Sequence, residues 1–317
     1  ELGEWVIATA LKQRELWQAA GLDIPVSVNV GARQLQQGDF VDRLRALLAA
    51  HPDFKPGNLE LEVLETSALE DMAKISSVIV ACREIGVNFA LDDFGTGYSS
   101  LTYLKRLPVS LLKIDQSFVR DMLDDPEDMA ILEGVIGLAT AFRREVIAEG
   151  VETVKHGEML LYLGCEKAQG YGIAHPMPAD KLPGWSAGWC TDPSWANLPA
   201  VNRADLPLLF ASADHRAWVA AMDSHLMSAR EAPPPLDHHQ CRFGTWLDSD
   251  GYARYGALPA FQTIDKLHRQ VHTMALELLE LHSQGRDPEV LWRLPELHAL
   301  RDVLVDQLML LVREIRR

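Results

Sequence analysis

The chain has 317 residues and a formal net charge of −15, from 45 acidic and 30 basic residues. This length is typical of two domains that each bury a core, and the negative charge disfavours binding to polymeric nucleic acid. The sequence contains no apolar run of about 18 residues and does not begin with a signal-peptide pattern, so we expect a cytoplasmic protein without a membrane segment.

The first part of the chain alternates between helical and strand-like patterns. A helix is predicted over residues 1–21, with Gly21 in the position of a C-cap. Helical periodicity also covers 72–85 and 129–142. Six short strands are predicted at 26–30, 59–63, 87–91, 111–114, 145–148 and 168–173. This alternation indicates a parallel α/β architecture for residues 1–188.

The composition changes after Gly172, where proline and tryptophan accumulate without a period, and we assign residues 189–204 to a linker. Residues 205–317 show no strand pattern and are predicted to form an all-α helical bundle. Its helices are expected at 207–230, 257–284, 288–292 with a break at Pro295, and 296–315. Eight of the eleven histidines lie in this last third of the chain.

Each predicted strand carries a polar side chain at or just after its C-terminal end. These side chains are Asn29, Glu62 with Glu65, Asp92 with Asp93, Lys113 with Asp115, Glu149 with Glu152, and Gln169. In a βα barrel the C-terminal strand ends converge on one face, where the carboxylates would repel one another unless cations held them. Oxygen ligands of this kind suit Mg²⁺ or Mn²⁺, and two such ions can activate water for attack on a phosphate ester.

A simpler interpretation is that these residues are helix caps. A single acidic residue at a strand end is more often an N-cap than a metal ligand. Capping does not explain the same feature on six consecutive strands, and Lys113 cannot serve as a cap. The pattern therefore favours a metal-dependent site in which Lys113 orients water or offsets phosphate charge.

Six motifs in order resemble the EAL-type cyclic-di-GMP phosphodiesterases over residues 1–188. The motifs are VSVNVGARQL, LELEVLET, DDFGTGYSSLTYLKRLPV, LKID, AEGVET and QGYGIAHPMP. The resemblance implies a TIM-like (β/α)8 barrel that hydrolyses cyclic-di-GMP to pGpG with two Mg²⁺ or Mn²⁺ ions. It also implies that Asn29, Glu62 and Asp92 are ligands of the first metal, and that Asp93 and Glu149 serve the second metal or its waters.

The same resemblance assigns further roles. Lys113 is similar to the residue that positions the nucleophilic water, and Gln169, like Asp93, is expected to contact the substrate. Glu65 is similar to the glutamate that holds the loop after Asp93, a loop associated in the family with dimerisation, and Glu152 would support the site. We accordingly expect catalytic or supporting roles for Lys113, Glu149, Glu65 and Glu152.

The chain departs from the family pattern at its start. The Glu-Ala-Leu motif, which supplies another metal-binding glutamate, would precede Glu1 and is absent. Six predicted strands plus the two expected there make eight, so we expect the barrel of this chain to be incomplete at the N-terminus. The sequence leaves open whether the chain is active on its own.

Three histidines of the bundle are predicted to face its core. His215 shares the apolar stripe of its helix, and His268 and His272 lie four residues apart on the stripe of a later helix. A buried polar group without a partner costs about 1–3 kcal/mol, so these imidazoles require ligands or hydrogen bonds. With the thiolate of Cys241 they would form a closed tetrahedral His3Cys zinc set, although a single such histidine is more often an ordinary core or surface residue.

The motifs HRAW at 215–218, CRFGTW at 241–246 and HRQVH at 268–272 resemble the CZB (chemoreceptor zinc-binding) family. The resemblance implies zinc ligation by His215, Cys241, His268 and His272, with His225, His238 and His239 as alternatives. It further implies a helical, often dimeric sensor that controls an attached module. The metal-bound thiolate of Cys241 would also be a site for oxidants.

The leading hypothesis is a metal-dependent cyclic-di-GMP phosphodiesterase that zinc or redox state regulates through the C-terminal bundle, acting as a homodimer. One alternative is a non-catalytic cyclic-di-GMP receptor or scaffold with a zinc-sensing module. Another is a structural zinc protein with an inert barrel. The sequence does not decide whether zinc activates or inhibits.

Overall fold

The computed structural model describes residues 2–97, 101–196, 198 and 200–315. Glu1 and residues 98–100 of the DDFGTGYSSLTYLKRLPV motif lie outside this part of the chain. The chain divides into two compact units. The first comprises 1–120, 131–161 and 165–198, and the second comprises 121–130, 162–164 and 199–317.

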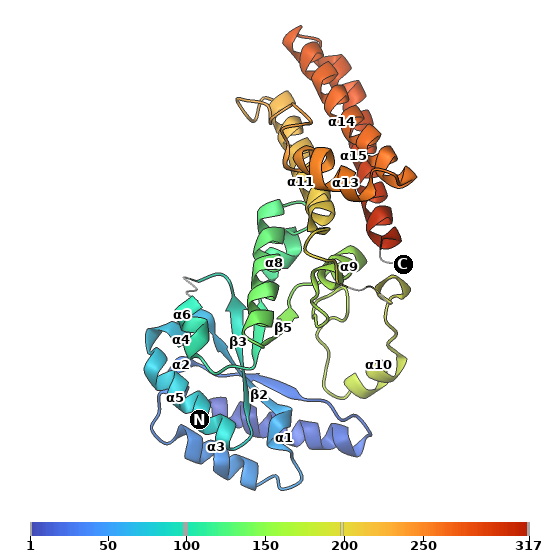
Figure 1. Cartoon of the computed structure of the whole chain (residues 1–317). Coiled ribbons are helices and arrows are strands. Elements are labelled where there is room, and N and C mark those ends of the chain that lie inside the picture. Colours follow the sequence, from blue (N-terminus) through green and yellow to red (C-terminus); the bar gives the residue numbers. More distant parts are fainter. Residues whose placement is uncertain (1, 98–100, 197, 199, 316–317) are drawn as a thin grey trace. The chain divides into compact units, whose positions relative to one another are not determined.

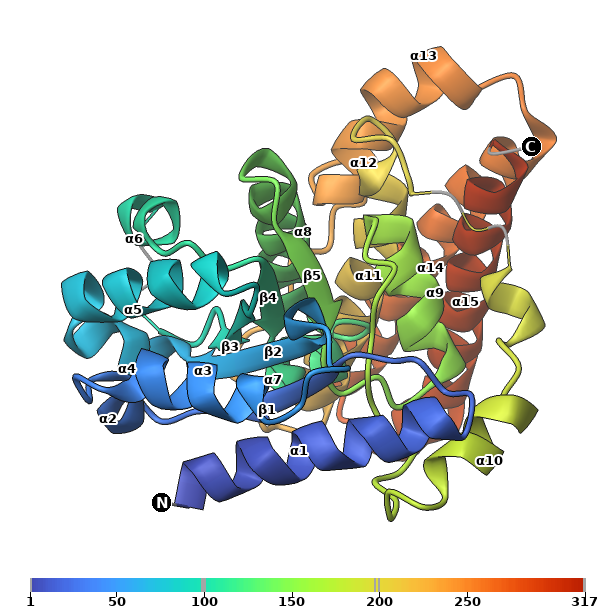
Figure 2. The ribbon, with the colours of Figure 1, turned by 90° about the horizontal axis from the view of Figure 1, so that it is seen from below.

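A parallel sheet of five strands forms the centre of the first unit (Figures 1 and 2). Its order is β1-β2-β3-β4-β5, so each strand pairs with the next one along the chain. The strands are β1 (Val26–Asn29), β2 (Leu59–Leu64), β3 (Asn88–Phe94), β4 (Leu111–Ile114) and β5 (Glu145–Ala148). Leu61, Phe89 and Leu112 are fully buried, as expected for a sheet whose strands read as apolar runs. Five of the six predicted strands are thus confirmed, while a closed eight-stranded barrel stays a prediction.

Helices precede, connect and follow the strands. They are α1 (Leu2–Ala19), α2 (Ala32–Leu35), α3 (Phe40–Ala49), α4 (Glu65–Glu70), α5 (Met72–Glu84), α6 (Leu101–Arg106), α7 (Gln116–Asp121), α8 (Pro126–Ala141), α9 (Val154–Leu163) and α10 (Leu182–Gly188). Helix α1 packs against β1 and α5 against β3 (Figure 2). Short 3₁₀ turns occur at η1 (Pro56–Asn58) and η2 (Pro193–Trp195). The helices predicted over 1–21, 72–85 and 129–142 correspond to α1, α5 and α8.

The sixth predicted strand, 168–173, is wrong as a strand. Only Ala168 forms a β-bridge, to Ala148, although Gln169 and Gly172 still form backbone hydrogen bonds with Ala148 and Val151. The cause is a close approach to the loop after β5, because a Cβ built on Gly170 would lie 2.3 Å from the backbone nitrogen of Val151. The backbone there needs glycine and cannot extend the ladder.

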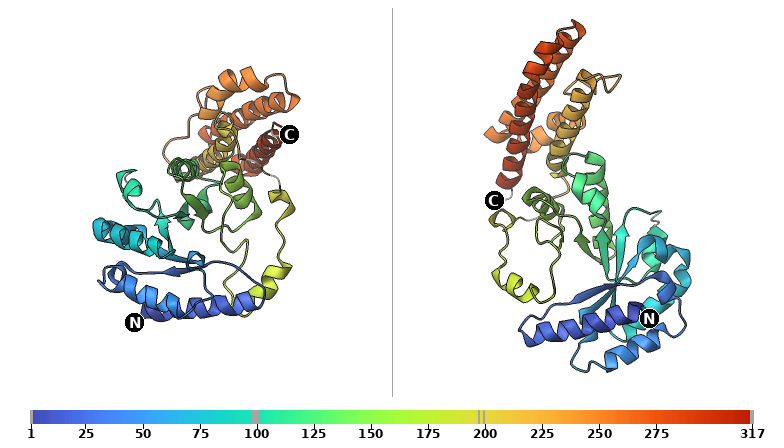
Figure 3. Two further views of the ribbon diagram at one scale, coloured as in Figure 1. Left: turned by 60° about the horizontal axis from the view of Figure 1, so that its bottom comes forward. Right: turned by 180° about the vertical axis from the view of Figure 1, so that it is seen from behind.

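The second unit contains α11 (Leu206–Leu226), α12 (Arg242–Trp246), a π-helical turn η3 (Leu247–Gly251), α13 (Tyr252–Tyr255), α14 (Pro259–Ser283) and α15 (Asp287–Glu314). The long helices α11, α14 and α15 pack along one another, as the ribbon views show (Figure 3). Buried Val219, Val271 and Leu308 come from one helix each. The predicted helical character of this part of the chain is confirmed.

The break predicted at Pro295 is wrong, because α15 continues through this residue. Proline removes one backbone hydrogen bond and crowds the preceding turn. Val290, Leu294 and Leu297 remain buried on both sides of it, and this packing keeps the helix continuous. Among the described residues, no helix combines the length and the apolar character that crossing a membrane requires.

Candidate functional site

Asp92 and Asp93 lie at a β-bulge within β3. The pairing of β3 with β4 shifts between Leu91 and Phe94, and Asp93 has a positive φ of 54°. Neighbouring residues of a regular strand point to opposite faces of the sheet, whereas a bulge re-aims a side chain. The irregularity therefore allows two consecutive carboxylates to serve the same site.

The ammonium group of Lys113 on β4 connects three carboxylates from three other segments. Its Nζ lies 2.8 Å from Oε2 of Glu62 on β2 and 2.9 Å from Oδ1 of Asp92 on β3. It also lies 2.6 Å from Oε1 of Glu149, which directly follows β5. Lys113, Glu62 and Asp92 are buried. Four neighbouring strands thus deliver one cation and three anions to a single point.

The balance of charge in this cluster is set by burial and by pairing. Burial alone would lower the pKa of Lys113, but its hydrogen bonds to Glu149, Glu62 and Asp92 raise the pKa above the ordinary lysine value. Burial raises the pKa of Glu149, against the opposing effect of Lys113. Three carboxylates surround one ammonium group, so the negative charge of the cluster exceeds the positive charge of Lys113. The site therefore favours a further cation.

Asp93 adds to this excess. Burial and the neighbouring carboxylates of Asp92 and Asp115 raise the pKa of Asp93. Asp92, Asp93 and Glu149 each offer a carboxylate oxygen, and these oxygens lie within 4.8 Å of one another. Such a group of hard oxygen donors fits Mg²⁺ or Mn²⁺. A bound ion would replace the protons that the raised pKa values of Asp93 and Glu149 favour.

The other predicted site residues of this unit lie around the cluster. Asn29 is exposed at the end of β1 and pairs in register with Glu62, outside the group of close carboxylates. Gln169 donates from Nε2 to Oε1 of Glu149 at 2.8 Å. Buried Glu65 accepts a hydrogen bond of 2.9 Å from the backbone nitrogen of Gly95, in the loop after Asp93.

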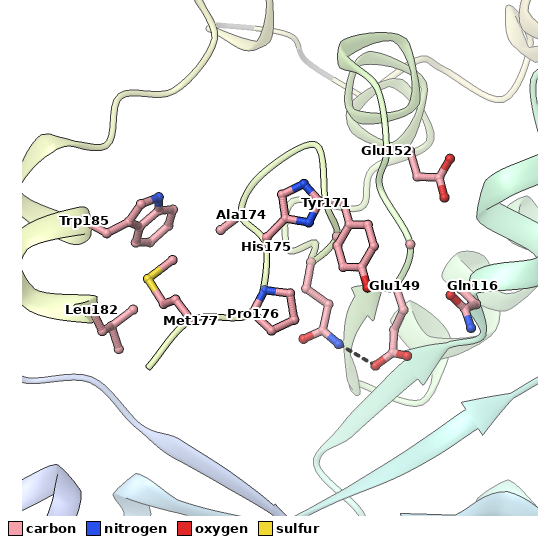
Figure 4. A pocket seen from close by; sticks show the side chains of 13 residues that line it. Gln116, Glu149, Glu152, Tyr171, Ala174, His175, Pro176, Met177, Leu182 and Trp185 are labelled. Carbon is pink, nitrogen blue, oxygen red and sulfur yellow. Dashed lines mark hydrogen bonds between the residues drawn. The ribbon is translucent and has the colours of Figure 1, made fainter. Parts of the chain in front are cut away.

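A cavity of about 570 Å³ opens beside Glu149 (Figure 4). Predicted residues Glu149, Glu152 and Gln169 line it. Further lining residues that sequence reasoning did not single out are Gln116, Tyr171, His175, Met177 and Trp185. The rings of Tyr171 and His175 are in contact, with centroids 4.4 Å apart and their planes tilted by 33°. Both stand in the QGYGIAHPMP motif, so their place in the motif was the available signal.

The second unit holds a separate cluster of metal-ligating side chains. One ligand atom each from His215, Cys241, His268 and His272 lies within 4.8 Å of the others. His215 comes from α11, Cys241 caps α12, and the other two come from α14. The three histidines are buried, as their apolar stripes predicted. This donor set has the composition of a closed tetrahedral zinc site.

Hydrogen bonds orient two of these imidazoles for metal binding. Nδ1 of His215 lies 2.7 Å from the carbonyl oxygen of Ala211, and Nδ1 of His272 lies 2.8 Å from that of Leu236. A carbonyl only accepts, so Nδ1 carries the hydrogen and Nε2 keeps its lone pair for a metal. Burial lowers the pKa of His215 to about 4 and also lowers that of His268, which keeps both rings neutral.

The loop around Cys241 is tightly fitted. Sγ of Cys241 lies 3.3 Å from Nε2 of His268 and accepts a hydrogen bond of 3.1 Å from the backbone nitrogen of Gly244. A Cβ on Gly244 would lie 1.7 Å from the carbonyl oxygen of His238, so this position requires glycine. Burial raises the pKa of the Cys241 thiol, which a bound Zn²⁺ would reverse.

The alternative zinc ligands lie outside the cluster of four. His238 is not among the four residues whose ligand atoms lie within 4.8 Å of one another, and its buried Nε2 has no hydrogen-bond partner among the described residues. His239 pairs with Asp248 at 2.6 Å. His225 lies near His282 at the end of α11.

Comparisons with known proteins match both parts of the chain. A family model described as the EAL domain matches residues 1–176, and one described as the chemoreceptor zinc-binding domain matches residues 215–279. The bifunctional diguanylate cyclase/cyclic di-GMP phosphodiesterase MucR of Pseudomonas aeruginosa is 40% identical over 57% of this chain and 27% of its own length. The cyclic di-GMP phosphodiesterase PdeR of Escherichia coli is 36% identical over 58% of this chain and 28% of its own length. The chain thus spans between a quarter and a third of these curated relatives.

Solved structures also resemble this chain, among them the following two. A structure described as the PaMucR phosphodiesterase in complex with c-di-GMP has a TM-score of 0.55 and 41% identity, covering 57% of this chain and 73% of that protein. The EAL domain of Mycobacterium smegmatis DcpA has a TM-score of 0.57 and 36% identity, covering 60% of this chain and 86% of that one.

Proposed function

We propose that this chain, which belongs to the EAL domain family, hydrolyses cyclic di-GMP to pGpG with two Mg²⁺ or Mn²⁺ ions. The observation that carries the proposal is the group of carboxylate oxygens from Asp92, Asp93 and Glu149, which lie within 4.8 Å of one another beside the single ammonium group of Lys113. The relatives named as cyclic di-GMP phosphodiesterases support the choice of substrate.

In this proposal Asn29, Glu62 and Asp92 hold one metal, while Asp93 and Glu149 hold the second or its waters. Bound divalent ions supply a polarised phosphoryl oxygen and a water of lowered pKa. Lys113 holds the carboxylates of Glu62, Asp92 and Glu149 in place, and its ammonium group would orient the attacking water and offset the charge that develops on the phosphate.

The cavity beside Glu149 is proposed as the binding place of the substrate. Its volume of about 570 Å³ lies in the usual range of small-molecule sites. Gln169, bonded to Glu149, would contact the substrate together with Asp93. Glu65 would hold the loop after Asp93 through Gly95, and Glu152 would support the rim of the cavity.

We further propose that the cluster of His215, Cys241, His268 and His272 binds Zn²⁺ and that zinc or oxidation of Cys241 regulates hydrolysis. The match of residues 215–279 to a zinc-binding domain supports this role. We propose domain boundaries at 1–188, 189–204 and 205–317. The homodimer expected from the sequence remains a prediction.

A receptor that binds cyclic di-GMP without hydrolysing it is the second candidate. It is favoured by one observation, namely that Lys113 already pairs with the carboxylates of Glu62, Asp92 and Glu149. In such a receptor, the lysine would take the place of a metal.

These two candidates are distinguished by an activity assay of the natural protein with Mn²⁺, in which chromatography measures the pGpG released from cyclic di-GMP. Asp92→Asn removes one anionic ligand and is expected to lower kcat more than about 100-fold, since even the supporting partners of metal ligands matter 10–100-fold. Asp53→Asn, at an exposed position, is the matched control and is expected to leave the rate unchanged. An unchanged rate for Asp92→Asn contradicts the proposal, and binding without pGpG release establishes the receptor.

A further inference from the structure

A second pair of histidines repeats the spacing of the zinc cluster along the same two helices. His225 follows His215 by ten residues on α11, and His282 follows His272 by ten residues on α14. Ten helical residues span about 15 Å. The second pair therefore stands about 15 Å further along the same two helices than the first.

The separation of the second pair fits a shared ligand. The ring centroids of His225 and His282 lie 6.0 Å apart. Within the zinc cluster, the centroid separations run from 4.8 Å for His268 and His272 to 6.2 Å for His215 and His272. The second pair therefore has a spacing already found among imidazoles that are placed to bind one ion.

Hydrogen bonds leave the Nε2 lone pair available on both rings. Nδ1 of His225 lies 3.0 Å from the carbonyl oxygen of Arg230, and Nδ1 of His282 lies 2.8 Å from Oδ1 of Asp287. A carbonyl and a carboxylate accept hydrogen bonds, so Nδ1 is the protonated nitrogen in each case. Metal-ligating histidines are oriented in this way by a carbonyl or carboxylate on the opposite nitrogen.

The local field favours a cation. Helix α11 ends at Leu226 and α14 at Ser283, so both histidines stand in the last turn of a helix. The negative ends of the α11 and α14 dipoles attract positive charge, and the carboxylate of Asp287 faces both His282 and the positive N-terminal end of α15, where Asp287 is the first residue. The side chain of His282 is 28% exposed, which leaves access for a hydrated ion.

We propose that His225 and His282 form a second transition-metal site at the C-terminal ends of α11 and α14. Imidazole ligands suit Zn²⁺, Ni²⁺ and Cu²⁺, with water completing the coordination. Two protein ligands hold a metal less tightly than the four of the His3Cys cluster, so the second site fills only after the first. A metal there links the ends of the two helices and stabilises the bundle.

The test is a zinc titration of the full chain that already holds one zinc, in excess Mg²⁺ to occupy the carboxylate cluster. Calorimetry is expected to show one further zinc per chain, and His225→Ala or His282→Ala is expected to weaken this second binding at least about tenfold. The control is His298→Ala, because His298 is also a half-exposed bundle histidine paired with an aspartate, Asp223, at 2.9 Å. The His298→Ala variant is expected to bind the second zinc as tightly as the unchanged chain does.

Long-range ¹H–¹⁵N spectra of the histidines provide the second readout. The second equivalent of zinc is expected to shift Nε2 of His225 and His282 together, with the first equivalent still bound. Thermal unfolding verifies that the variants remain folded. Full second-site binding in either alanine variant, or Nε2 signals that do not move, overturns the proposal. Neither readout depends on cyclic di-GMP hydrolysis. Failure of the second metal site is therefore distinguishable from failure of the proposed function.

Discussion

Replacing Lys113 with methionine is expected to lower the free energy of unfolding of the metal-free protein by about 3–5 kcal/mol. The ammonium group of Lys113 is buried and lies within hydrogen-bond distance of three carboxylates. Removing one partner from a buried ionic group leaves the remaining charges without compensation. Urea unfolding without divalent ions measures this effect directly.

Mn²⁺ is expected to restore part of the stability lost in Lys113→Met, because a bound cation compensates the same carboxylates. Lys167→Met is the matched control. Lys167 pairs with Glu145 at 2.7 Å, but its side chain is 55% exposed, so its loss is expected to cost less than about 1 kcal/mol. Equal losses in the two variants, or no recovery with Mn²⁺, would show that the carboxylates do not form one cation-dependent cluster.

Removing zinc is expected to unfold the helical bundle at a lower temperature than the rest of the chain. Metal binding to three imidazoles and a thiolate contributes directly to folding, with about 10–16 kcal/mol measured for structural zinc in small zinc-finger peptides. Without zinc, the buried rings of His215, His268 and His272 remain in the core. Nδ1 of His268 has no hydrogen-bond partner among the described residues, which adds to the cost.

Circular dichroism of thermal unfolding, with and without a zinc chelator, checks this expectation. Cys241→Ala is expected to resemble the chelated protein even when zinc is present. Cys190→Ala is expected to behave like the unchanged chain, because Cys190 is exposed and lies outside the cluster. A bundle whose melting is insensitive to chelator contradicts zinc binding by these four residues.

Periodicity predicted much of the fold from local sequence. The alternation of short apolar runs with helix-periodic segments predicted five strands and the long helices. The apolar stripes of the helices predicted the burial of His215, His268 and His272. These features depend on contacts that the period of each element already encodes.

Features that depend on neighbouring segments were not predictable in the same way. The bulge at Asp93 exists only in the pairing of β3 with β4, and the turn at Gly170 follows from the close backbone of Val151. Pro295 was predicted to end a helix because local chemistry favours a break, yet packing on both sides keeps α15 continuous. The pairing of His225 with His282 likewise arises from the register of two helices.

The candidate site shows the same division. The polar residues at strand ends predicted which side chains would meet at one site, and Glu62, Asp92 and Glu149 do meet at Lys113. The hydrogen bonds of Lys113 to these three carboxylates and the cavity wall formed by Tyr171 and Trp185 required the folded chain. The distance between side chains on two different strands cannot be predicted from the spacing of residues along one strand.

Anomalous diffraction from crystals of the chain grown with Mn²⁺ tests the central claim most directly. We predict manganese peaks coordinated by carboxylate oxygens of Asp92, Asp93 and Glu149. An anomalous map without manganese at these residues, with Lys113 still bonded to Glu62, Asp92 and Glu149, would contradict it.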